Sequence, residues 1–328
     1  MNIVFLGKFG RDAVGPAIAA VPGAVLTYAD DVKQHAAAFR QAEGVVLAGP
    51  AYSADVAEVL AGARKLRWIQ TLSAGYENLQ RFGVPPGVTV TNAGDAWSVS
   101  VAEHAMALLL ALAKRLPEAV RQKERRAWER QLMSYMGSLQ DRTMVVVGFG
   151  SIGKEIALRA RAFGMKIVAV MRTPKPSELA DDVYASSELA AALRLADVAV
   201  IAVPAHPDTV NLINAQTLRE CRRGCLLINV ARGEVIDQDA LVDALRTGHI
   251  GGAGIDVAVP EPLPEANPLW RAPNLIITPH VAGGGELVMT KLAELIADNV
   301  ARQSGGQALR CIVIRPQPHF KTDLSTLQ

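Results

Sequence analysis

The chain is poor in aromatic residues and cysteine, and it has no long hydrophobic run. Aromatic residues make up 5% of its 328 residues, and only three cysteines are present: Cys221, Cys225 and Cys311. Their spacing matches no metal-binding motif and three thiols cannot all pair, so they are typical of a reducing cytosol. The longest apolar run, residues 105–113, is too short to cross a bilayer and predicts a buried helix.

An excess of one charge is also lacking, since the formal net charge is only +2 and no face shows a dense basic run. This pattern does not favour a nucleic acid partner. Residues 1–5 have the pattern of a strand, with no basic segment or cleavage site after them, so we expect no signal peptide. We therefore expect a cytoplasmic protein with neither a nucleic acid nor a membrane partner. The tail from residue 315 is polar, contains two prolines and is expected to be loosely held.

What the chain does have is an alternation of strand and helix patterns from its first residues. Short buried strands are predicted at 3–6, 24–28 and 44–48, and helices at 11–20, 31–41 and 53–63. This order is typical of a parallel sheet with crossover helices. The glycine-containing segment 7–10 lacks a third glycine at phosphate-loop spacing, so we interpret it as an ordinary turn.

A second alternating block begins at residue 143 and follows a long helical pattern at 99–130, whose first half is apolar and second half charged. Its strands are predicted at 143–147, 166–171, 198–203, 225–229, 252–256 and 274–277, and a last helix at 286–303. We therefore predict an α/β fold with two doubly wound parallel-sheet domains. Residues 1–98 and 287–328 form one domain, and residues 99–286 form an inserted one.

The inserted domain opens on a glycine-rich turn between a strand and a helix. The segment Gly148-Phe149-Gly150-Ser151-Ile152-Gly153 matches the dinucleotide-binding fingerprint in its required context. The first glycine allows a tight turn, the second lets the backbone approach a pyrophosphate, and the third lets the helix pack closely on the strand. The helix N-terminus then offers N–H groups to the phosphates.

The residues after the next strand indicate which nicotinamide cofactor is bound. An NAD-preferring fold places an acidic residue about 20 residues past the glycines. Here Arg172 lies nineteen residues after Gly153, followed by Thr173 and Lys175, and no acid appears before Glu178. These side chains would attract a 2′-phosphate, so we predict NADPH as the preferred cofactor. The alternative is a solvated basic turn beside bound NAD.

Three further strand ends carry side chains suited to chemistry on a small acid. Arg232 follows one strand and can hold a carboxylate through two hydrogen bonds, although a solvated arginine in a turn remains the alternative. Glu261 and His280 follow two others, and a carboxylate beside an imidazole favours the protonated ring that a general acid requires. At the same edge we expect Pro204, Ala231, Asp256 and Gly283 to contact the cofactor.

The other five histidines are interpreted differently. His35, His249 and His319 lie in polar, surface-like contexts, and His206 lies in a proline-flanked loop. His104 follows Glu103 early in an apolar helix and is interpreted as structural.

These motifs, in this order, resemble the D-isomer-specific 2-hydroxyacid dehydrogenase family. The resemblance includes the segments 66–70, 73–76, 100–104, 229–233, 261–264, 268–270 and 278–280, together with the fingerprint. It implies a flavodoxin-like substrate domain, an inserted Rossmann dinucleotide-binding domain, and Arg232, Glu261 and His280 as the catalytic residues. It also implies substrate carboxylate binding by amides near Ala74 and Gly75, and a homodimer built on the helix at 99–130.

The resemblance favours NADPH-dependent reduction of a small 2-oxo acid, of the glyoxylate or hydroxypyruvate type, to the D-2-hydroxy acid. The alternative is a nicotinamide-nucleotide-sensing interaction protein, as in the corepressor branch, but the chain lacks long disordered flanks. Formate-type chemistry is disfavoured because Glu261 is present. Two departures from the family pattern, Ala258 and the Gly284-Gly285 pair, bear on the pocket. Tyr76, Trp97, Tyr135 and Met136 are candidates for lining it, or for core or dimer packing.

Overall fold

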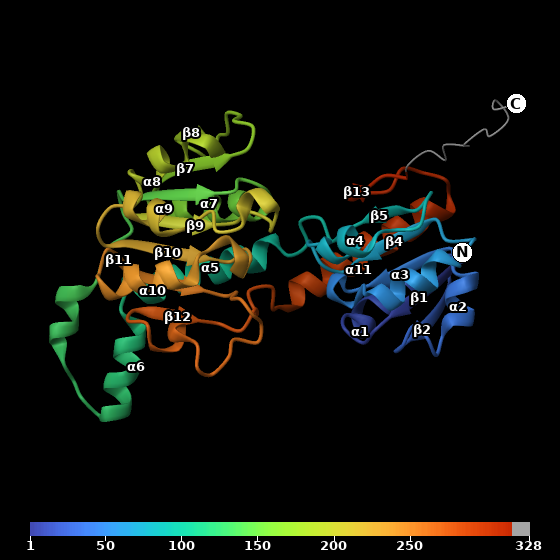
Figure 1. Ribbon diagram of the computed structural model, residues 1–328, viewed down its shortest axis with the longest axis horizontal. Helices are drawn as coiled ribbons and strands as arrows, with labels where there is room; N and C mark the ends of the chain where they lie inside the picture. The colour runs from blue at the N-terminus through green and yellow to red at the C-terminus, as the bar shows by residue number, and fades with distance from the viewer. Residues whose placement is uncertain (317–328) are drawn as a thin grey trace, which may run out of the picture. The chain divides into compact units, whose positions relative to one another are not determined.

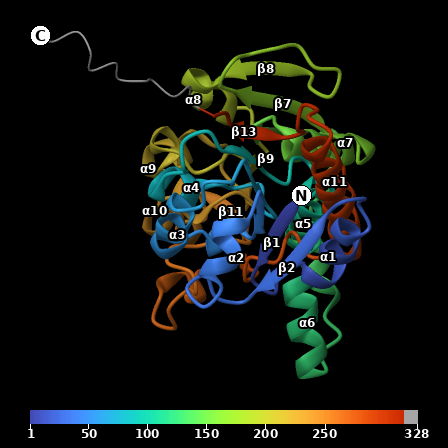
Figure 2. The same cartoon turned by 90° about the vertical axis from the view of Figure 1, so that its right-hand side faces the viewer.

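The computed structural model describes residues 1–316 and divides the chain into two compact units (Figures 1 and 2). One unit comprises Met1–Trp97 and the chain from Gly285 onward, and the other comprises Ser98–Gly284. The chain thus crosses between units after Trp97 and Gly284, whereas the sequence placed these crossings after residues 98 and 286.

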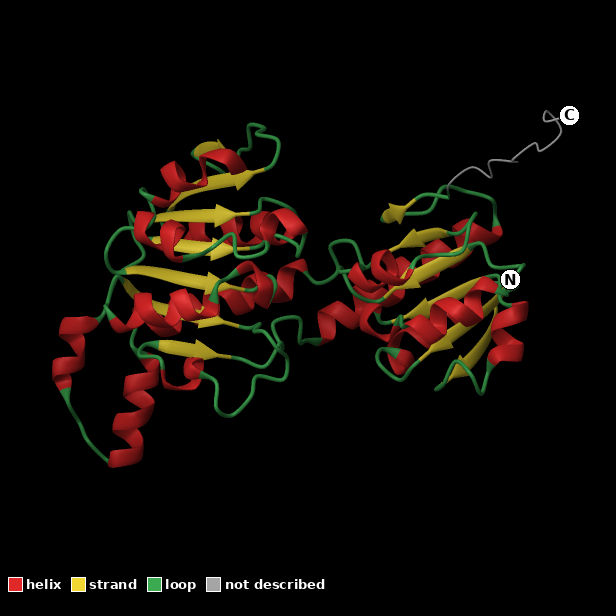
Figure 3. Ribbon diagram, in the orientation of Figure 1, coloured by secondary structure: helices red, strands yellow, loops and turns green. Residues whose placement is uncertain are grey.

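The first unit is built on a six-stranded sheet in the order β13-β5-β4-β3-β1-β2 (Figure 3). The strands are β1 (Asn2–Leu6), β2 (Val25–Ala29), β3 (Gly44–Leu47), β4 (Trp68–Thr71), β5 (Thr89–Thr91) and β13 (Ile312–Ile314). All neighbours pair in parallel except β13, which runs antiparallel to β5. The predicted parallel sheet therefore has an antiparallel edge strand.

Helices cover both faces of this sheet, because β3 and β4 are buried throughout and need apolar cover on each side. Helices α2 (Ala36–Gln41), α3 (Ala54–Ala61) and α4 (Glu77–Phe82) pack on one face. Helices α1 (Arg11–Ala19) and α11 (Glu286–Ser304) pack on the other and contact each other. Helix α2 begins five residues later than predicted, because residues 32–35 form turns rather than helix.

The second unit holds a seven-stranded parallel sheet in the order β12-β11-β10-β9-β6-β7-β8. Its strands are β6 (Thr143–Val147), β7 (Lys166–Met171), β8 (Asp182–Ala185), β9 (Val198–Ile201), β10 (Cys225–Asn229), β11 (Ile250–Ile255) and β12 (Leu275–Ile277). The order reverses between β6 and β9. Ligands of open α/β sheets bind in the crevice at such a switch point, beyond the carboxyl ends of the strands.

Two helical layers enclose the second sheet. Helices α5 (Ser98–Ala113) and α7 (Ser151–Ala162) contact each other on one face. Helices α8 (Leu189–Leu193), α9 (Ala215–Glu220) and α10 (Gln238–Arg246) bury their apolar residues in the core on the other face. None of the helices within residues 1–316 is long and apolar enough to span a membrane.

The single long helix predicted at 99–130 is wrong. Helix α5 ends at Ala113, Arg115 adopts a left-handed conformation with φ of 55°, and α6 (Leu116–Arg125) starts beside Pro117. The change of direction follows from that backbone turn, which an α-helix cannot contain. Helix α6 and the 3₁₀ turn Arg130–Tyr135 form an arm, residues 116–135, that extends away from its sheet (Figure 1). No residue of either helical segment is buried.

Candidate active site

The glycine turn after β6 has the geometry that its sequence predicted. Gly148 has a φ of +96°, and a Cβ there would lie 2.5 Å from the Ala202 carbonyl oxygen, which follows β9. A Cβ on Gly153 would lie 2.1 Å from the Gly148 oxygen, so helix and strand can approach only without a side chain. These two glycines set the shape of the turn.

Gly150 differs from both, because a Cβ at this position would meet no atom within 4 Å. It precedes the first residue of α7, Ser151, and offers no side chain to cap the helix amides. The backbone therefore faces open space at a helix N-terminus, as a bound pyrophosphate requires. Phe149 is buried beneath the turn and Ile152 is half-buried. The residues at 148–153 thus fit a dinucleotide.

The basic residues predicted to select the cofactor lie beside this turn. Strand β7 pairs with β6 in the register Val147 to Val170, and the Gly148 N–H donates to the Val170 carbonyl at 2.9 Å. Arg172 follows directly after β7 and is exposed, as are Thr173 and Lys175. The two basic side chains and the Thr173 hydroxyl therefore lie at the end of β7, the strand next to the glycine turn. Pro204 is exposed in the loop after β9, the strand that pairs with β6 on its other side.

Arg232 lies in a loop after β10 that a neighbouring amide holds in place. The Asn229 side chain accepts from the Ala231 N–H at 3.0 Å and donates to the Arg232 carbonyl at 3.1 Å. The Arg232 guanidinium donates to the Ala231 carbonyl at 2.8 Å. A Cβ on Gly233 would lie 2.3 Å from the Ala258 carbonyl carbon, so this glycine lets the loops after β10 and β11 meet.

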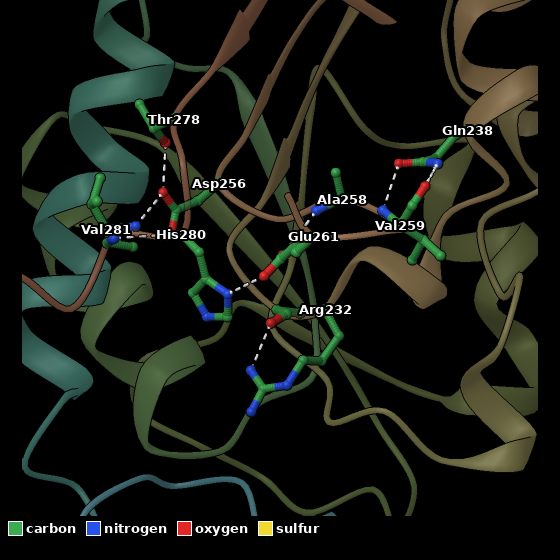
Figure 4. A network of polar contacts seen from close by, with 11 residues as sticks. Arg232, Gln238, Asp256, Ala258, Val259, Glu261, Thr278, His280 and Val281 are labelled. Carbon is green, nitrogen blue, oxygen red and sulfur yellow. Dashed lines mark hydrogen bonds and ion pairs between the residues drawn. The ribbon is translucent and has the colours of Figure 1, made fainter. Parts of the chain in front are cut away.

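Glu261 and His280 are hydrogen-bonded (Figure 4). The His280 Nδ1 lies 2.7 Å from the Glu261 Oε2, and the other carboxylate oxygen accepts from the Ala258 N–H at 3.1 Å. Since an ionised carboxylate only accepts hydrogen bonds, the contact places a hydrogen on Nδ1. Nε2 is then the ring atom that can exchange a proton with a ligand. Ala258, a departure from the family pattern, contributes its backbone here.

A buried carboxylate holds the turn that carries His280. The Asp256 side chain, 2% exposed, accepts from the Thr278 hydroxyl at 2.6 Å and from the amides of Val281 and Ala282 at 2.9 and 2.8 Å. The His280 N–H donates to the Asp256 carbonyl at 2.7 Å, and His280 has a φ of +54°. Non-glycine residues rarely adopt this conformation, so the surrounding hydrogen bonds are needed to keep it.

The structure therefore gathers Arg232, Glu261 and His280 around one cavity of about 150 Å³. The cavity lies beyond the carboxyl ends of β10, β11 and β12, where the sequence placed the three residues. It is lined by Arg232, Gly233, Glu234, Ala258, Val259, Pro260, Glu261 and His280. Ala231 is buried beside Arg232, and the half-buried Gly283 closes the segment after His280.

The other residues that the sequence offered as candidates for lining the pocket lie outside this cavity. Tyr135 lines a separate cavity with Arg142, Val198 and Leu226, at the opposite, amino-terminal ends of β6, β9 and β10, and Met136 follows it in the chain. Neither lines the cavity of Arg232, Glu261 and His280. Tyr76 and Trp97 are half-buried and pack against the two cores of the first unit.

Ala74 and Gly75 lie in the turn after β4 of the first unit. The Asn92 side chain donates to the Ala74 carbonyl at 2.7 Å, and the Ser73 hydroxyl donates to the Gly75 carbonyl at 2.7 Å. The turn is thus held through its carbonyl groups.

The sequence missed the polar groups that support the site. Asn229 was taken only as part of a strand end, and His104 was interpreted as structural. The His104 Nε2 lies 2.9 Å from the Thr278 hydroxyl and 3.6 Å from the Asp256 carboxylate. A histidine in an otherwise apolar helix is a signal of a buried polar partner, but nothing local indicates a partner 174 residues away.

Comparisons with known proteins identify the family of the chain. Residues 106–282 match the family model described as D-isomer specific 2-hydroxyacid dehydrogenase, NAD binding domain. The chain is 35% identical to the glyoxylate reductase of Thermococcus onnurineus over 79% of both chains. It is 37% identical to the glycerate dehydrogenase of Methylorubrum extorquens over 65% of this chain and 68% of the relative.

A solved structure shows the same fold with a nucleotide bound. It is a D-isomer specific 2-hydroxyacid dehydrogenase from Xanthobacter autotrophicus in complex with NADPH and MES. This chain matches it with a TM-score of 0.81 and 27% identity over 95% of this chain and 98% of that one. The chain has the fingerprint, fold and nucleotide-binding unit of these enzymes, which use a nicotinamide cofactor and act on CH–OH groups, and it therefore belongs to the D-isomer-specific 2-hydroxyacid dehydrogenase family.

Proposed function

We propose that this enzyme reduces a small 2-oxo acid of the glyoxylate or hydroxypyruvate type to the D-2-hydroxy acid, with NADPH as the preferred reductant. The observation that carries the proposal is the cavity around Arg232, Glu261 and His280, in the same unit as the dinucleotide turn. The names of the relatives, glyoxylate reductase and glycerate dehydrogenase, support the substrate class.

Arg232 binds the substrate in this proposal. Its planar guanidinium can hold a carboxylate by two parallel hydrogen bonds and polarise the neighbouring carbonyl. The family resemblance also implies carboxylate binding by the amides near Ala74 and Gly75, which belong to the first unit. Their turn is suited to this role because its carbonyl groups are occupied by Asn92 and Ser73.

His280 supplies the proton that reduction requires. The reduced nicotinamide, when bound, supplies the hydride to the carbonyl carbon. As negative charge develops on the carbonyl oxygen, Nε2 of His280 donates its proton there. Glu261, bonded to Nδ1, fixes the orientation of the ring and stabilises its positive charge before transfer.

The cofactor preference rests on Arg172, Thr173 and Lys175. Their position after β7 is where an acidic residue binds the ribose hydroxyls in NAD-preferring folds. A carboxylate would repel a 2′-phosphate, whereas a guanidinium binds it. Pro204, Ala231, Asp256 and Gly283 complete the proposed cofactor contacts from neighbouring strand ends.

We also propose that the protein is a cytoplasmic homodimer. The arm at 116–135 exposes large apolar side chains that a monomer would leave in water: Leu116, Val120, Trp128, Met133 and Tyr135. Trp128 is 92% exposed. Several large exposed apolar side chains on one short segment are typical of an interface between subunits.

The proposal is tested with a panel of 2-oxo acids, followed at 340 nm with NADPH and with NADH. Efficient turnover of glyoxylate or hydroxypyruvate that His280→Ala abolishes is the expected result, with chiral analysis of the glycerate formed from hydroxypyruvate identifying the D-product. Nucleotide binding without turnover of any 2-oxo acid would contradict the proposal and favour the alternative, a nicotinamide-sensing protein of the corepressor type.

A further inference from the structure

A hydrogen-bonded chain links helix α5 to the turn that carries His280. His104 lies in the second turn of α5, and its ring is mostly buried, with 22% of the side chain exposed. Its Nε2 lies 2.9 Å from the Thr278 Oγ1, and the Thr278 hydroxyl lies 2.6 Å from the Asp256 Oδ1. This chain lies behind the cavity and does not line it.

The direction of these bonds follows from the chemistry of the three groups. Asp256 accepts amide hydrogens from Val281 and Ala282, so its carboxylate acts as an acceptor. The single hydrogen of the Thr278 hydroxyl is therefore donated to it. The same oxygen then accepts from His104, which requires a hydrogen on the His104 Nε2. The His104 N–H in α5 therefore fixes the side-chain rotamer of Thr278.

The amides that Asp256 binds lie immediately after His280, and Thr278 lies two residues before it. The backbone of His280 itself donates to the Asp256 carbonyl at 2.7 Å. His280 keeps a left-handed φ of +54°, a conformation that persists only when its surroundings determine it. Asp256 thus holds the turn, and Thr278, bonded to His104, is the side chain that holds Asp256 Oδ1 beside the two amides.

We propose that His104 is a positioning residue for proton transfer, which acts through Thr278 and Asp256 to hold His280 in register with Glu261. This inference deepens the proposed function and rests on it for the role of His280. Small displacements of a catalytic group are costly: misplacement by about 1 Å can lower a rate a hundredfold. Loss of the His104 donor should lower kcat about tenfold and leave substrate and cofactor binding nearly unchanged.

The charged groups around both rings are few. The ring of His104 faces Asp256 at 3.6 Å, after β11. From α7, Arg159 pairs with the adjacent Glu103 at 3.3 Å and with Glu155. His280 faces Glu261 directly, and Arg232 and Glu234 line the same cavity. None of these charged side chains is changed in the variants below, except Glu103 in the control variant.

The experiment compares four variants of the full chain. His104→Leu removes the donor at similar volume, and His104→Gln keeps an N–H donor at the position of Nε2. Thr278→Val removes the hydroxyl and leaves α5 unaltered, so it serves even where His104→Leu does not fold. Glu103→Gln is the matched control, because it changes the preceding residue and its ion pair with Arg159 only.

Two readouts are needed. The first is kcat and KM for the 2-oxo acid as a function of pH. The second is the pH at which His280 titrates, followed by NMR of protein labelled with ¹³C at histidine Cε1 and assigned with His280→Gln. The second readout requires no substrate.

His104→Leu and Thr278→Val should lower kcat about tenfold, with KM and NADPH affinity within about threefold of the parent. The His280 titration should differ from that of the parent in both, because its ring loses alignment with Glu261. His104→Gln should recover most of both properties, and Glu103→Gln should resemble the parent. Parental kcat and an unchanged His280 titration in His104→Leu or Thr278→Val would overturn the proposal.

The two proposals fail in distinguishable ways. If no 2-oxo acid is reduced but the His280 titration still depends on His104, the proposed function is wrong and the structural coupling stands. If turnover is normal in the parent and in both donor-removing variants, the proposed function stands and the positioning role is wrong.

Discussion

At the scale of single residues, the proposed roles of His280 and Glu261, whose Nδ1 and Oε2 lie 2.7 Å apart, lead to a prediction on how the rate depends on pH. In the proposed mechanism, reduction requires protonated His280, so activity should fall on the basic side as the ring loses its proton. Glu261→Gln removes the anion that stabilises the imidazolium, and the basic limb of the kcat/KM profile for reduction should move to lower pH. Oxidation of the hydroxy acid requires neutral His280 and should gain at the pH where reduction declines.

The measurement is a pair of pH–rate profiles in both directions, with His280→Ala as the reference for lost proton transfer. Glu265→Gln is a control that removes an acidic residue a few positions away, outside the lining of the cavity. Superimposable profiles for Glu261→Gln and the parent would show that the carboxylate has no part in proton transfer.

The second prediction at the residue scale concerns Arg172 and the choice between NADPH and NADH. Arg172→Asp should reverse the preference of kcat/KM for NADPH over NADH, because a carboxylate repels the 2′-phosphate and accepts from the ribose hydroxyls. Loss of one charge-assisted contact costs about 1.5–3 kcal/mol, or about ten- to a hundredfold. Arg161→Asp, on the surface of α7, is a control of equal charge. Equal use of both nucleotides by the parent would contradict the prediction.

At the scale of the elements, Asp197 connects the starts of β6 and β10 just ahead of β9. Its carboxylate accepts from the Thr143 N–H at 2.8 Å and lies 3.4 and 3.3 Å from the Arg142 and Arg222 guanidinium groups. Burial raises the pKa of Asp197, but the Thr143 N–H and the two guanidinium groups outweigh it, so the net pKa lies below its ordinary value.

A carboxylate with a lowered folded-state pKa stabilises the fold above its unfolded pKa, and this contribution disappears as the pH falls through the folded pKa. Asp197→Asn should therefore destabilise the protein by about 1–3 kcal/mol at pH 7, and the difference should shrink below about pH 4. Urea unfolding of both proteins across this range measures it. Asp243→Asn, whose carboxylate is 78% exposed, should cost almost nothing at either pH.

A further element-scale prediction concerns the contact between the loops after β10 and β11. A methyl group on Gly233 would overlap the backbone of Ala258, which no rotamer change can relieve. Gly233→Ala should separate Arg232 from Glu261 and lower kcat/KM for the 2-oxo acid about tenfold or more, with NADPH affinity nearly retained. Gly62→Ala, where φ is −85° and the nearest atom to an added methyl lies 3.5 Å away, tests the effect of an added methyl elsewhere. Parental kcat/KM in Gly233→Ala would show that the loops adjust freely.

The elements also show where sequence reasoning succeeds and where it fails. Strands β6 and β7 begin and end as predicted, because a glycine turn and a polar turn bound apolar runs. Strand β8 was missed, since a four-residue edge strand is defined by its pairing with β7 rather than by its own pattern. The break before α6 was missed because a left-handed arginine leaves no trace in hydrophobic periodicity.

The three residues of the candidate site could be predicted because each follows a strand, and parallel strands end at one edge. The polar groups that support these three residues could not be predicted from the sequence. The hydrogen bonds that Asn229 makes with Ala231 and Arg232 depend on loop geometry, and the contact of His104 with Thr278 joins segments far apart in sequence. Such contacts become visible only when the packing of α5 on the sheet is known.

At the scale of the whole molecule, the proposed homodimer depends on the exposed arm. Trp128→Ser should raise the dimer dissociation constant at least tenfold, because large aromatic side chains contribute most to interfaces. Light scattering after size-exclusion chromatography over a dilution series measures this. Trp270→Ser is a matched control, since Trp270 is 51% exposed but lies outside the arm. A parent that is monomeric at micromolar concentration would contradict the proposal.

The placement of Arg232, Glu261 and His280 within Ser98–Gly284 has a consequence for how new specificities arise. All the groups proposed to move the hydride and the proton belong to one continuous stretch of chain, while the other unit is assembled from both ends of the sequence. The residues proposed to carry the reaction can therefore be inherited together as one continuous block of sequence. The flanking segments can then be exchanged without altering that block, and grafting them from a relative tests whether they influence which acid is accepted.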